Sequence, residues 1–343
     1  MMARLKALVW KIPGARPVLR RVYVPIRRTV SRLNCYMYDM GNDRRNSYWF
    51  PPSSAYGKLS HELIFQHHKL EKGLSLPPGG RKFFGAQACN EVLEILKRWK
   101  RAGHPVQAPV YQSSLAVLKA YRLHLNQLSS DNAQAKKLSA SIGPFLNDLV
   151  FEDSYKTPVP LAPSPDGSFP VLQDLALARR SVRNFSEKAV ERDAVIAAVK
   201  LAQLSPSACN RQPWKLHLFE NNEQIRDLLA LQNGNSGFGQ TIPLLAAVTV
   251  DMESGFDPSE RVGPVLDGGL FLMAFLLALQ SQGISSCCLN WAVVPAQDRK
   301  GHLVSQIPKN ERILTLLAIG YAAEDCIVPL SARRPLDDAL LWH

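Results

Sequence analysis

The ten residues Ser205-Pro-Ser-Ala-Cys-Asn-Arg-Gln-Pro-Trp214 are the most informative stretch of the sequence. An amphipathic helix pattern comes before them, and Pro206 ends it because proline cannot continue a helix. An apolar strand pattern, residues 214–219, follows at once. The loop between them offers hydroxyls, amides and backbone N–H groups, with Arg211 as its one formal charge. Such groups suit the edge of a polar heterocycle, although a well-capped surface loop is the alternative.

A second motif, Arg179-Arg-Ser-Val-Arg183, lies upstream of this loop. Together the two motifs resemble the nitroreductase family of flavin mononucleotide (FMN) enzymes. That family carries an Arg-x-Ser-x-Arg/Lys element at the end of its first helix and, later, a Ser-Pro-Ser-x-x-Asn-x-Gln-Pro-Trp loop. Asp267-Gly-Gly269 and the segment 283–290 also look like the family pattern. The resemblance implies an intertwined homodimer with flavin at each interface.

The composition is that of an ordinary globular protein, with 343 residues, 46% of them hydrophobic and 20% charged. The net charge of +12 is unevenly spread, because nine Lys and Arg residues and no acidic residue precede Asp39. Six cysteines show no CxxC and no metal-ligand spacing, which predicts a reducing compartment and no metal site. The longest apolar run, residues 270–279, is too short to span a bilayer, and no secretory signal is recognisable. We therefore expect a cytoplasmic protein.

Residues 1–50 form a basic arm in which Pro13, Pro17 and Pro25 are expected to interrupt any long helix. One interpretation is a loosely packed tail. The other is adsorption to an anionic membrane surface, which would place the protein at the inner face of the membrane. Nucleic-acid binding is not expected, since no recognised module is present.

Residues 51–155 predict a small all-helical domain, with a proline-rich linker at 156–170. Gly73 is expected to be the C-cap of the first helix. His61 and His68 could share a helix face, but they lack the cysteine or carboxylate companions of a metal site. The string that starts at His67 resembles a segment found before the nitroreductase domain in bacterial proteins often associated with polysaccharide biosynthesis. The predicted helices are 56–72, 84–102, 109–127 and 133–150, the last interrupted near Gly143-Pro144.

Residues 171–343 alternate helix and strand patterns. They predict an α+β fold, a nitroreductase-like sandwich with a central, mostly antiparallel sheet flanked by helices. The apolar helix 265–280 is expected to be buried on all sides, with Phe271, Phe275 and Leu276 against a second subunit. The predicted helices are 171–180, 191–204, 223–231, 265–280 and 297–305, and the strands are 214–219, 244–250, 286–289 and 313–319.

The resemblance also implies the residues that bind FMN. Arginines would bind the phosphate through forked, charge-assisted hydrogen bonds, and a cation at the pyrimidine edge would stabilise reduced flavin. Gln212 is expected to be a structural hydrogen-bonder of the loop. The residues implied at the phosphate and ribityl groups are Arg179, Arg180, Ser181, Arg333 and Arg334, and Arg183 would face the pyrimidine edge. The partner subunit would contribute Pro206, Ser207, Ala208 and Asn210. Backbone groups around Cys288 and Leu289 would face N5 and O4.

The substrate face is expected at Asn235–Gln240, where Phe238 fits the aromatic residue of the family. Gly239 stands where the family has a polar flavin contact, which leaves Gln240 or Asn235 as substitutes. Ser331 likewise stands where the family often has a second phosphate-binding cation. No arrangement of side chains suggests a catalytic acid or base, which agrees with chemistry carried by a flavin.

The predicted function is therefore an FMN-dependent oxidoreductase. By resemblance, NAD(P)H would reduce FMN in a ping-pong cycle, and a nitroaromatic, a quinone or another small acceptor would take the electrons. Two alternatives stay open. One is a specific FMN-dependent dehydrogenase of polysaccharide assembly, and the other is a membrane-associated regulatory or scaffold protein that keeps the fold.

Overall fold

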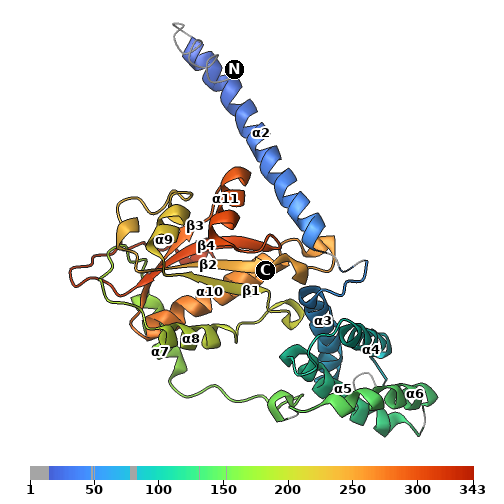
Figure 1. Cartoon of the computed structure of the whole chain (residues 1–343). Helices are drawn as coiled ribbons and strands as arrows, with labels where there is room; N and C mark the ends of the chain where they lie inside the picture. The colour runs from blue at the N-terminus through green and yellow to red at the C-terminus, as the bar shows by residue number, and fades with distance from the viewer. Residues whose placement is uncertain (1–14, 48, 50, 78–82, 131, 152) are drawn as a thin grey trace.

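The computed structural model describes residues 15–47, 49, 51–77, 83–130, 132–151 and 153–343. Three parts follow one another along the chain: a long helix, a helical unit and an α+β sandwich (Figure 1). The helical unit lies beside one end of the sandwich, and the long helix projects from the same region.

The long helix, α2 (Ala15–Asn46), corrects the expectation that prolines would interrupt the arm. Pro17 lies in its first turn, where a missing N–H costs nothing because that group has no partner within the helix. Pro25 lies inside α2 and removes one backbone hydrogen bond, which the rest of a 32-residue helix tolerates. Pro13 and Trp10 lie outside the described residues.

The helical unit has the predicted elements: α3 (Tyr56–Leu74), α4 (Ala86–Arg101), α5 (Pro109–Leu128) and α6 (Ala133–Ile142). The α-helix ends where Gly143-Pro144 begins the 3₁₀ turn η1 (Gly143–Asp148), as expected. The unit has its own hydrophobic core, since apolar residues recur every three or four positions on each helix. The largest side chains of this core are Trp99, Tyr111 and Tyr121.

Gly73 is not the C-cap that the sequence predicts. It lies inside α3, whose C-cap is Ser75. A Cβ atom on Gly73 would lie 2.0 Å from Cε2 of Phe84, so the glycine makes room for an aromatic ring. The residue is needed for close packing and not to end the helix.

The sandwich is an α+β fold with one antiparallel sheet, as the sequence predicts. Its strands are β1 (Trp214–Phe219), β2 (Leu244–Asp251), β3 (Ser285–Asn290) and β4 (Glu311–Gly320), in the order β1-β2-β4-β3. One core joins α8 (Arg192–Ala202) and α10 (Gly263–Ser281) to one face of the sheet. A second core joins α9 (Asn222–Leu229) and α11 (Pro295–Ser305) to the other face. All eight residues of β2 are buried because both faces of this central strand are covered.

Helix α10 corrects the prediction about its apolar stripe. Phe271 and Phe275 are 1% and 0% exposed and belong to the core of their own chain, so they cannot meet a second subunit. The side that faces away from the sheet carries Leu266, Leu270 and Met273, which are exposed. By length and composition, Pro258–Ser281 passes the test for a membrane span, but here this segment includes a helix packed on a sheet.

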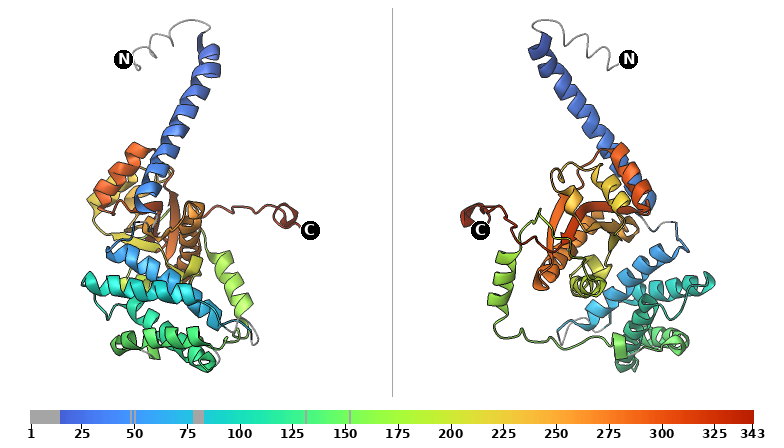
Figure 2. Two further views of the ribbon diagram at one scale, coloured as in Figure 1. Left: turned by 90° about the vertical axis from the view of Figure 1, so that its right-hand side faces the viewer. Right: turned by 60° about the vertical axis from the view of Figure 1, so that its left-hand side comes forward.

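Two segments with exposed apolar side chains adjoin this sandwich. Helix α7 (Ser168–Ala178) contacts α10, yet Phe169, Leu172 and Leu177 are exposed. The C-terminal segment from Glu324 leaves the sandwich and extends away from it (Figure 2). Its exposed apolar residues are Ile327, Val328, Leu330, Leu336, Leu340, Leu341 and Trp342.

Candidate functional site

The Arg179–Arg183 segment lies beside the edge strand β3. The Val182 N–H donates to the Ser286 carbonyl at 3.1 Å, and Ser181 forms a parallel bridge with Ser286. Burial raises the pKa of the neighbouring Cys287 thiol, whereas the charge of Arg183 and a hydrogen bond with Ser181 act to lower it. The structure thus brings the arginine motif to β3, where Cys288 and Leu289 also lie. Cys287 and Leu289 are buried, and Cys288 is exposed.

The three arginines of this segment have no acidic partner. Within the described chain, no carboxylate lies within ion-pair distance of Arg179, Arg180 or Arg183. Arg180 Nη1 donates only to the Arg179 carbonyl, at 3.2 Å, and Arg183 Nη1 only to the Ser181 carbonyl, at 3.3 Å. Three uncompensated guanidinium groups with free donors fit a phosphate-bearing ligand.

The Ser205–Trp214 loop has a tightly specified backbone. Cys209, Asn210 and Gln212 have φ values of 51°, 55° and 50°, in the left-handed region that residues other than glycine adopt at a cost. Gln212 holds this shape, since its N–H donates to Ser207 Oγ at 3.0 Å and its amide donates to Asn210. The predicted structural role of Gln212 is confirmed. Pro206 and Asn210 remain exposed, and Ser207 and Ala208 are half-buried.

Arg211 anchors the same loop from the inside. It is 2% exposed and makes a two-pronged ion pair with Glu260, with N–O distances of 2.5 and 2.8 Å. It also donates to the carbonyls of Ala208 and Ser254, at 2.9 and 2.6 Å. A buried charge is stable only when it is paired and hydrogen-bonded in this way. The guanidinium therefore fixes the backbone of the loop.

Asp267 ties the loop to the first turns of α10. The Ala208 N–H lies 3.1 Å from both carboxylate oxygens of Asp267, and Ser205 Oγ donates to the Leu270 carbonyl at 3.4 Å. The arginine segment, in contrast, lies beside β3, which begins after α10 ends at Ser281. Fourteen residues of helix separate Asp267 from Ser281, or about 21 Å at 1.5 Å per residue. Within one chain, the two motifs thus lie at opposite ends of α10.

The remaining predicted residues are not gathered at either motif. Phe238, the predicted aromatic residue of the substrate face, is 6% exposed and belongs to the core under α9. The Asn235 amide is engaged by Leu229 and Gln232, whereas Gln240 is exposed. Arg333 and Arg334 are exposed on the C-terminal segment, which extends away from the sandwich (Figure 2). The apolar residues of this core come from distant parts of the sequence, so a local pattern does not show that Phe238 is buried.

The helical unit packs against the back of the loop. Arg211 lies 5.6 Å from the ring of Phe65 on α3 and 5.9 Å from that of Phe256, at distances typical of cation–π contact. Trp49 contacts both rings, with centroids 5.2 and 5.7 Å away. This aromatic group, Trp49, Phe65 and Phe256, joins the helical unit to the residue that anchors the loop.

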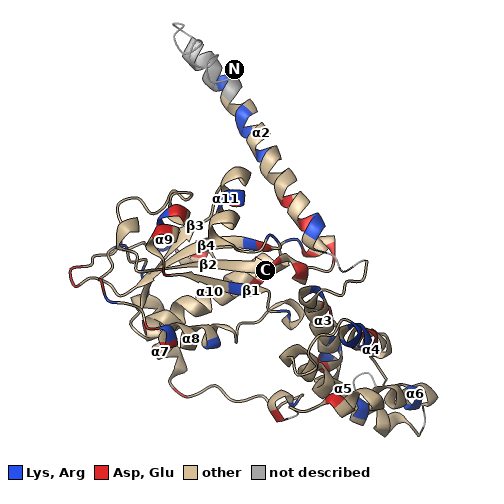
Figure 3. Ribbon diagram, viewed as in Figure 1, with Lys and Arg blue, Asp and Glu red and all other residues tan. Residues whose placement is uncertain are grey.

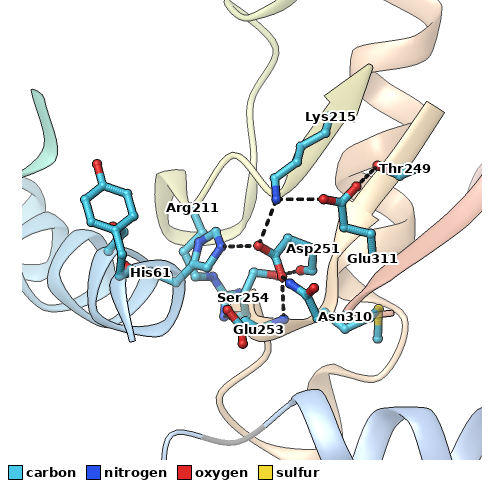
Figure 4. Close-up of polar contacts among 12 residues, drawn as sticks. His61, Arg211, Lys215, Thr249, Asp251, Glu253, Ser254, Asn310 and Glu311 are labelled. Carbon is cyan, nitrogen blue, oxygen red and sulfur yellow. Dashed lines mark hydrogen bonds and ion pairs between the residues drawn. The ribbon is translucent and has the colours of Figure 1, made fainter. Parts of the chain in front are cut away.

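A buried polar cluster forms the second half of this junction (Figure 4). His61 of α3 lies 3.5 Å from Asp251 at the end of β2, and Lys215 bridges Asp251 and Glu311 at 3.4 and 2.9 Å. Burial alone would raise the pKa of Asp251, but the hydrogen bond with His61 and the charges of His61 and Lys215 outweigh it and lower the pKa to about 2. The pKa of Glu311 is also lowered, since hydrogen bonds from His217, Thr249 and Lys215 outweigh its burial.

A cavity of about 560 Å³ lies between the helical unit and the loop. Asn210 and Gln212 line it on one side, and His67 and Glu71 of α3 line it on the other. Burial lowers the pKa of His67 to about 4, so its ring is neutral at pH 7. The string that starts at His67 thus borders the Ser205–Trp214 loop. His68 pairs with Glu71 at 2.8 Å, and the described residues contain no group of metal-ligating side chains.

Sequence reasoning missed Arg211, Asp267 and Phe65 as residues that position the loop. Arg211 is the one charged residue in an otherwise neutral motif, and that signal could have marked it as an anchor. Asp267 lies within a motif that was recognised, but no pattern links it to Ala208. Phe65 could not have been found, because its contact joins residues of two structural units.

Comparison with known proteins now adds to this geometry. Residues 176–233 match the model of the nitroreductase family. The matched segment contains both the Arg179–Arg183 motif and the Ser205–Trp214 loop. It covers less than half of the chain, and it starts after the helical unit.

Two relatives and two solved structures place this match in context. A protein of Archaeoglobus fulgidus, provisionally named an NADH dehydrogenase/NAD(P)H nitroreductase, is 28% identical over 43% of this chain and 83% of its own. An iodotyrosine deiodinase of Hydra vulgaris is 26% identical over 48% of this chain and 70% of its own. A nitroreductase family protein from Streptococcus pneumoniae has a TM-score of 0.43 at 22% identity, over 50% of this chain and 99% of its own. An FMN complex of a nitroreductase-like protein from Desulfovibrio desulfuricans has a TM-score of 0.42 at 19% identity, over 53% and 98%.

Proposed function

We propose that this protein is an FMN-dependent oxidoreductase whose flavin sites form between two copies of the chain. The observation that carries the proposal is the separation of the two motifs by the length of α10. Both belong to the segment that matches the nitroreductase family. Two motifs that serve one ligand can meet only if a second chain brings its loop to the arginine segment of the first.

The exposed surface supports a second copy. Exposed apolar side chains lie on α7, α8 and α10, and α10 contacts both of the other helices. Exposed apolar side chains gathered on packed helices are typical of an interface. The exposed residues are Phe169, Val171, Leu172 and Leu177 of α7, Ile196 and Leu201 of α8, and Leu266, Leu270 and Met273 of α10.

The C-terminal segment would also find cover on a second copy. Strand β1 is an edge of the sheet, and a groove of about 820 Å³ runs between it and α8. Val195, Leu216 and Phe271 line this groove. Ile327, Val328 and Leu330 are exposed on their own chain. They could pack into this groove on a second copy, since a loop or helix commonly covers an open strand edge. Such a crossing would carry Arg333 and Arg334 to the partner.

Each part of the chain would then have a definite task at the flavin. Arg179, Arg180 and Ser181 would hold the phosphate and ribityl groups, and Arg183 would place positive charge at the pyrimidine edge. The neutral loop of the partner would supply hydrogen bonds to the ring from a backbone that Arg211 holds in place. FMN, when bound, would accept a hydride from a reduced nicotinamide and pass electrons to a small acceptor.

Flavin loading tests this proposal directly. The purified full-length chain should show flavin absorbance near roughly 450 nm, and the apoprotein should bind one FMN per chain while it sediments as a dimer. Oxidation of NADH and NADPH with a quinone or a nitroaromatic acceptor then identifies the donor. A chain that stays monomeric with saturating FMN bound would contradict the shared site.

The iodotyrosine deiodinases give a reason to consider a second reaction. Three relatives carry names of this activity, at 24–27% identity. The same assay can include a halogenated phenol as acceptor, with release of halide as the measured product. Halide release, without reduction of quinones or nitroaromatics, would favour this second function.

A further inference from the structure

Helix α2 has an apolar stripe that faces away from the rest of the molecule. Its five residues are spaced by four, three, four and three positions, and at 3.6 residues per turn they fall within an arc of about 80°. Each is 54–61% exposed. The stripe consists of Ile26, Val30, Leu33, Met37 and Met40.

The opposite side of α2 is the side that meets the sandwich. Tyr38 donates to Asp298 at 2.7 Å and stacks against Arg299, and Asp39 pairs with Arg312 at 3.0 Å. Among the described residues, the polar contacts that join α2 to the sandwich come only from its last third. The rest of the helix projects freely (Figures 1 and 2). The chain therefore holds the stripe outward and leaves it uncovered.

The charge of α2 is as one-sided as its apolar stripe. Arg27 lies about 100° from Ile26 on one side of the stripe, and Arg32 lies about 120° away on the other. No acidic residue precedes Asp39 in the sequence, and acidic side chains on α2 occur only toward the sandwich (Figure 3). A narrow stripe could also pair with a second copy of α2. Such pairing usually relies on acidic and basic residues that flank the seam and attract each other, and along the part of α2 before Asp39 no acidic residue flanks the stripe.

We propose that α2 binds the surface of an anionic lipid membrane, with the stripe in the acyl–headgroup boundary and the flanking arginines among the lipid phosphates. A helix with one apolar face and a basic polar face binds in this orientation. The inference depends on α2 alone and is independent of the flavin proposal. It gives the sandwich a fixed attachment through the last third of α2, so that the candidate flavin site would work beside the membrane.

The test uses the full-length protein and sedimentation with phosphatidylglycerol vesicles. Leu33 and Leu123 are both 60% exposed on helices, but Leu123 lies on α5, outside the stripe. Leu33→Ser should weaken vesicle binding at least tenfold because it removes an apolar side chain from the acyl boundary, whereas Leu123→Ser should change it less than about twofold. Arg27→Gln with Arg32→Gln should weaken binding further and reduce its salt dependence, since each nearby arginine contributes roughly fivefold.

Three results would overturn the inference. The first is equal vesicle binding by the Leu33 and Leu123 variants. The second is equal binding of the wild type to phosphatidylcholine and phosphatidylglycerol vesicles. The third is a wild-type chain that binds neither kind of vesicle but forms a larger assembly that Leu33→Ser breaks, which would show that a second copy covers the stripe.

Discussion

At the scale of single residues, Arg179 and Arg183 belong to one motif but have different surroundings. Arg179 is half-buried beside Cys288, and Arg183 is exposed at the end of the segment. The proposed flavin site gives the first to the phosphate and the second to the pyrimidine edge. The two side chains should therefore affect different properties of a bound flavin.

Arg179→Ala should lower FMN affinity by about ten- to a hundredfold, since a charged hydrogen bond contributes about 1.5–3 kcal/mol. Arg183→Ala should instead lower the reduction potential of the flavin, with a smaller loss of binding. Lysine should restore function better at 183 than at 179, because only the phosphate needs a forked donor. FMN titration and potentiometry on the four variants check this, and equal shifts in potential for both alanine variants would contradict the assignment.

Arg211 should be essential for the shape of the loop. Arg211→Ala leaves Glu260 without its buried partner and should lower the free energy of unfolding by about 3–5 kcal/mol. Arg192 is a matched control, because it makes the same two-pronged ion pair with Glu220 on the exposed surface. Arg192→Ala should leave stability nearly unchanged, since exposed ion pairs contribute little. Urea unfolding of both variants measures the two losses of unfolding free energy. Similar losses would show that the buried ion pair of Arg211 stabilises the fold no more than the exposed one of Arg192.

The cluster at the junction predicts how stability depends on pH. The pKa of Asp251 in the folded chain is about 2, below its value of about 3.8 in an unfolded chain. The stabilisation from this carboxylate is therefore complete above about pH 5 and is lost as the pH falls through 4 towards 2, and one pKa unit corresponds to about 1.4 kcal/mol. Asp251→Asn should be less stable than wild type at pH 7, with a difference that shrinks on acidification. Unfolding at several pH values tests this, and Asp166→Asn, in the exposed linker, should show no such convergence.

At the scale of elements, the two sides of the apolar helix α10 have different surroundings. Its inner side fills the core under the sheet, and its outer side is exposed. The sequence alone suggested a stripe of Phe271, Phe275 and Leu276 for the partner. These three residues pack against the sheet of their own chain instead, because strands β1, β2 and β4 present apolar side chains to that side of α10.

A charge on the outer side of α10 should disrupt the proposed dimer without unfolding the chain. Leu266→Lys places a charge on a leucine that is 65% exposed in the single chain, so folding should persist while the dimer weakens at least tenfold. Leu303→Lys is the control, on the opposite layer and 75% exposed. Light scattering over a concentration series measures both. A dimer that is unchanged by Leu266→Lys would exclude this face as the interface.

At the scale of the whole molecule, the C-terminal segment should contribute more to the proposed dimer and its flavin site than to the stability of the fold. Residues 327–343 have no buried side chain, so their removal should leave the thermal stability of a single chain close to wild type. FMN affinity should fall at least tenfold, because the phosphate site would lose Arg333 and Arg334. The full-length double variant Arg333→Gln, Arg334→Gln separates the two effects: it should lose FMN affinity and stay dimeric. Full FMN affinity in the truncated chain would exclude a role for the segment.

The sequence by itself determined most of the elements and their kind. Periodic apolar residues and the prolines and glycines between them act over one or two turns, so the helices of the helical unit and the four strands lie within a few residues of their predicted places. The two motifs that the sequence singled out both lie within the segment that matches the nitroreductase family model. The helix α2 escaped prediction, because the cost of Pro25 is local whereas the helix gains over its entire length.

Only the tertiary structure decided which side of each element is covered. Phe238 lies in a polar loop of the sequence but belongs to a core that also contains Trp291, more than fifty residues away. Arg211 reads as a lone loop charge, yet Glu260 and the rings of Phe65 and Phe256 make it an anchor. The Arg179–Arg183 motif and the Ser205–Trp214 loop are separated because they lie at opposite ends of α10. Burial and pairing depend on partners that chain topology brings together over long sequence distances, and a local pattern contains no information about them.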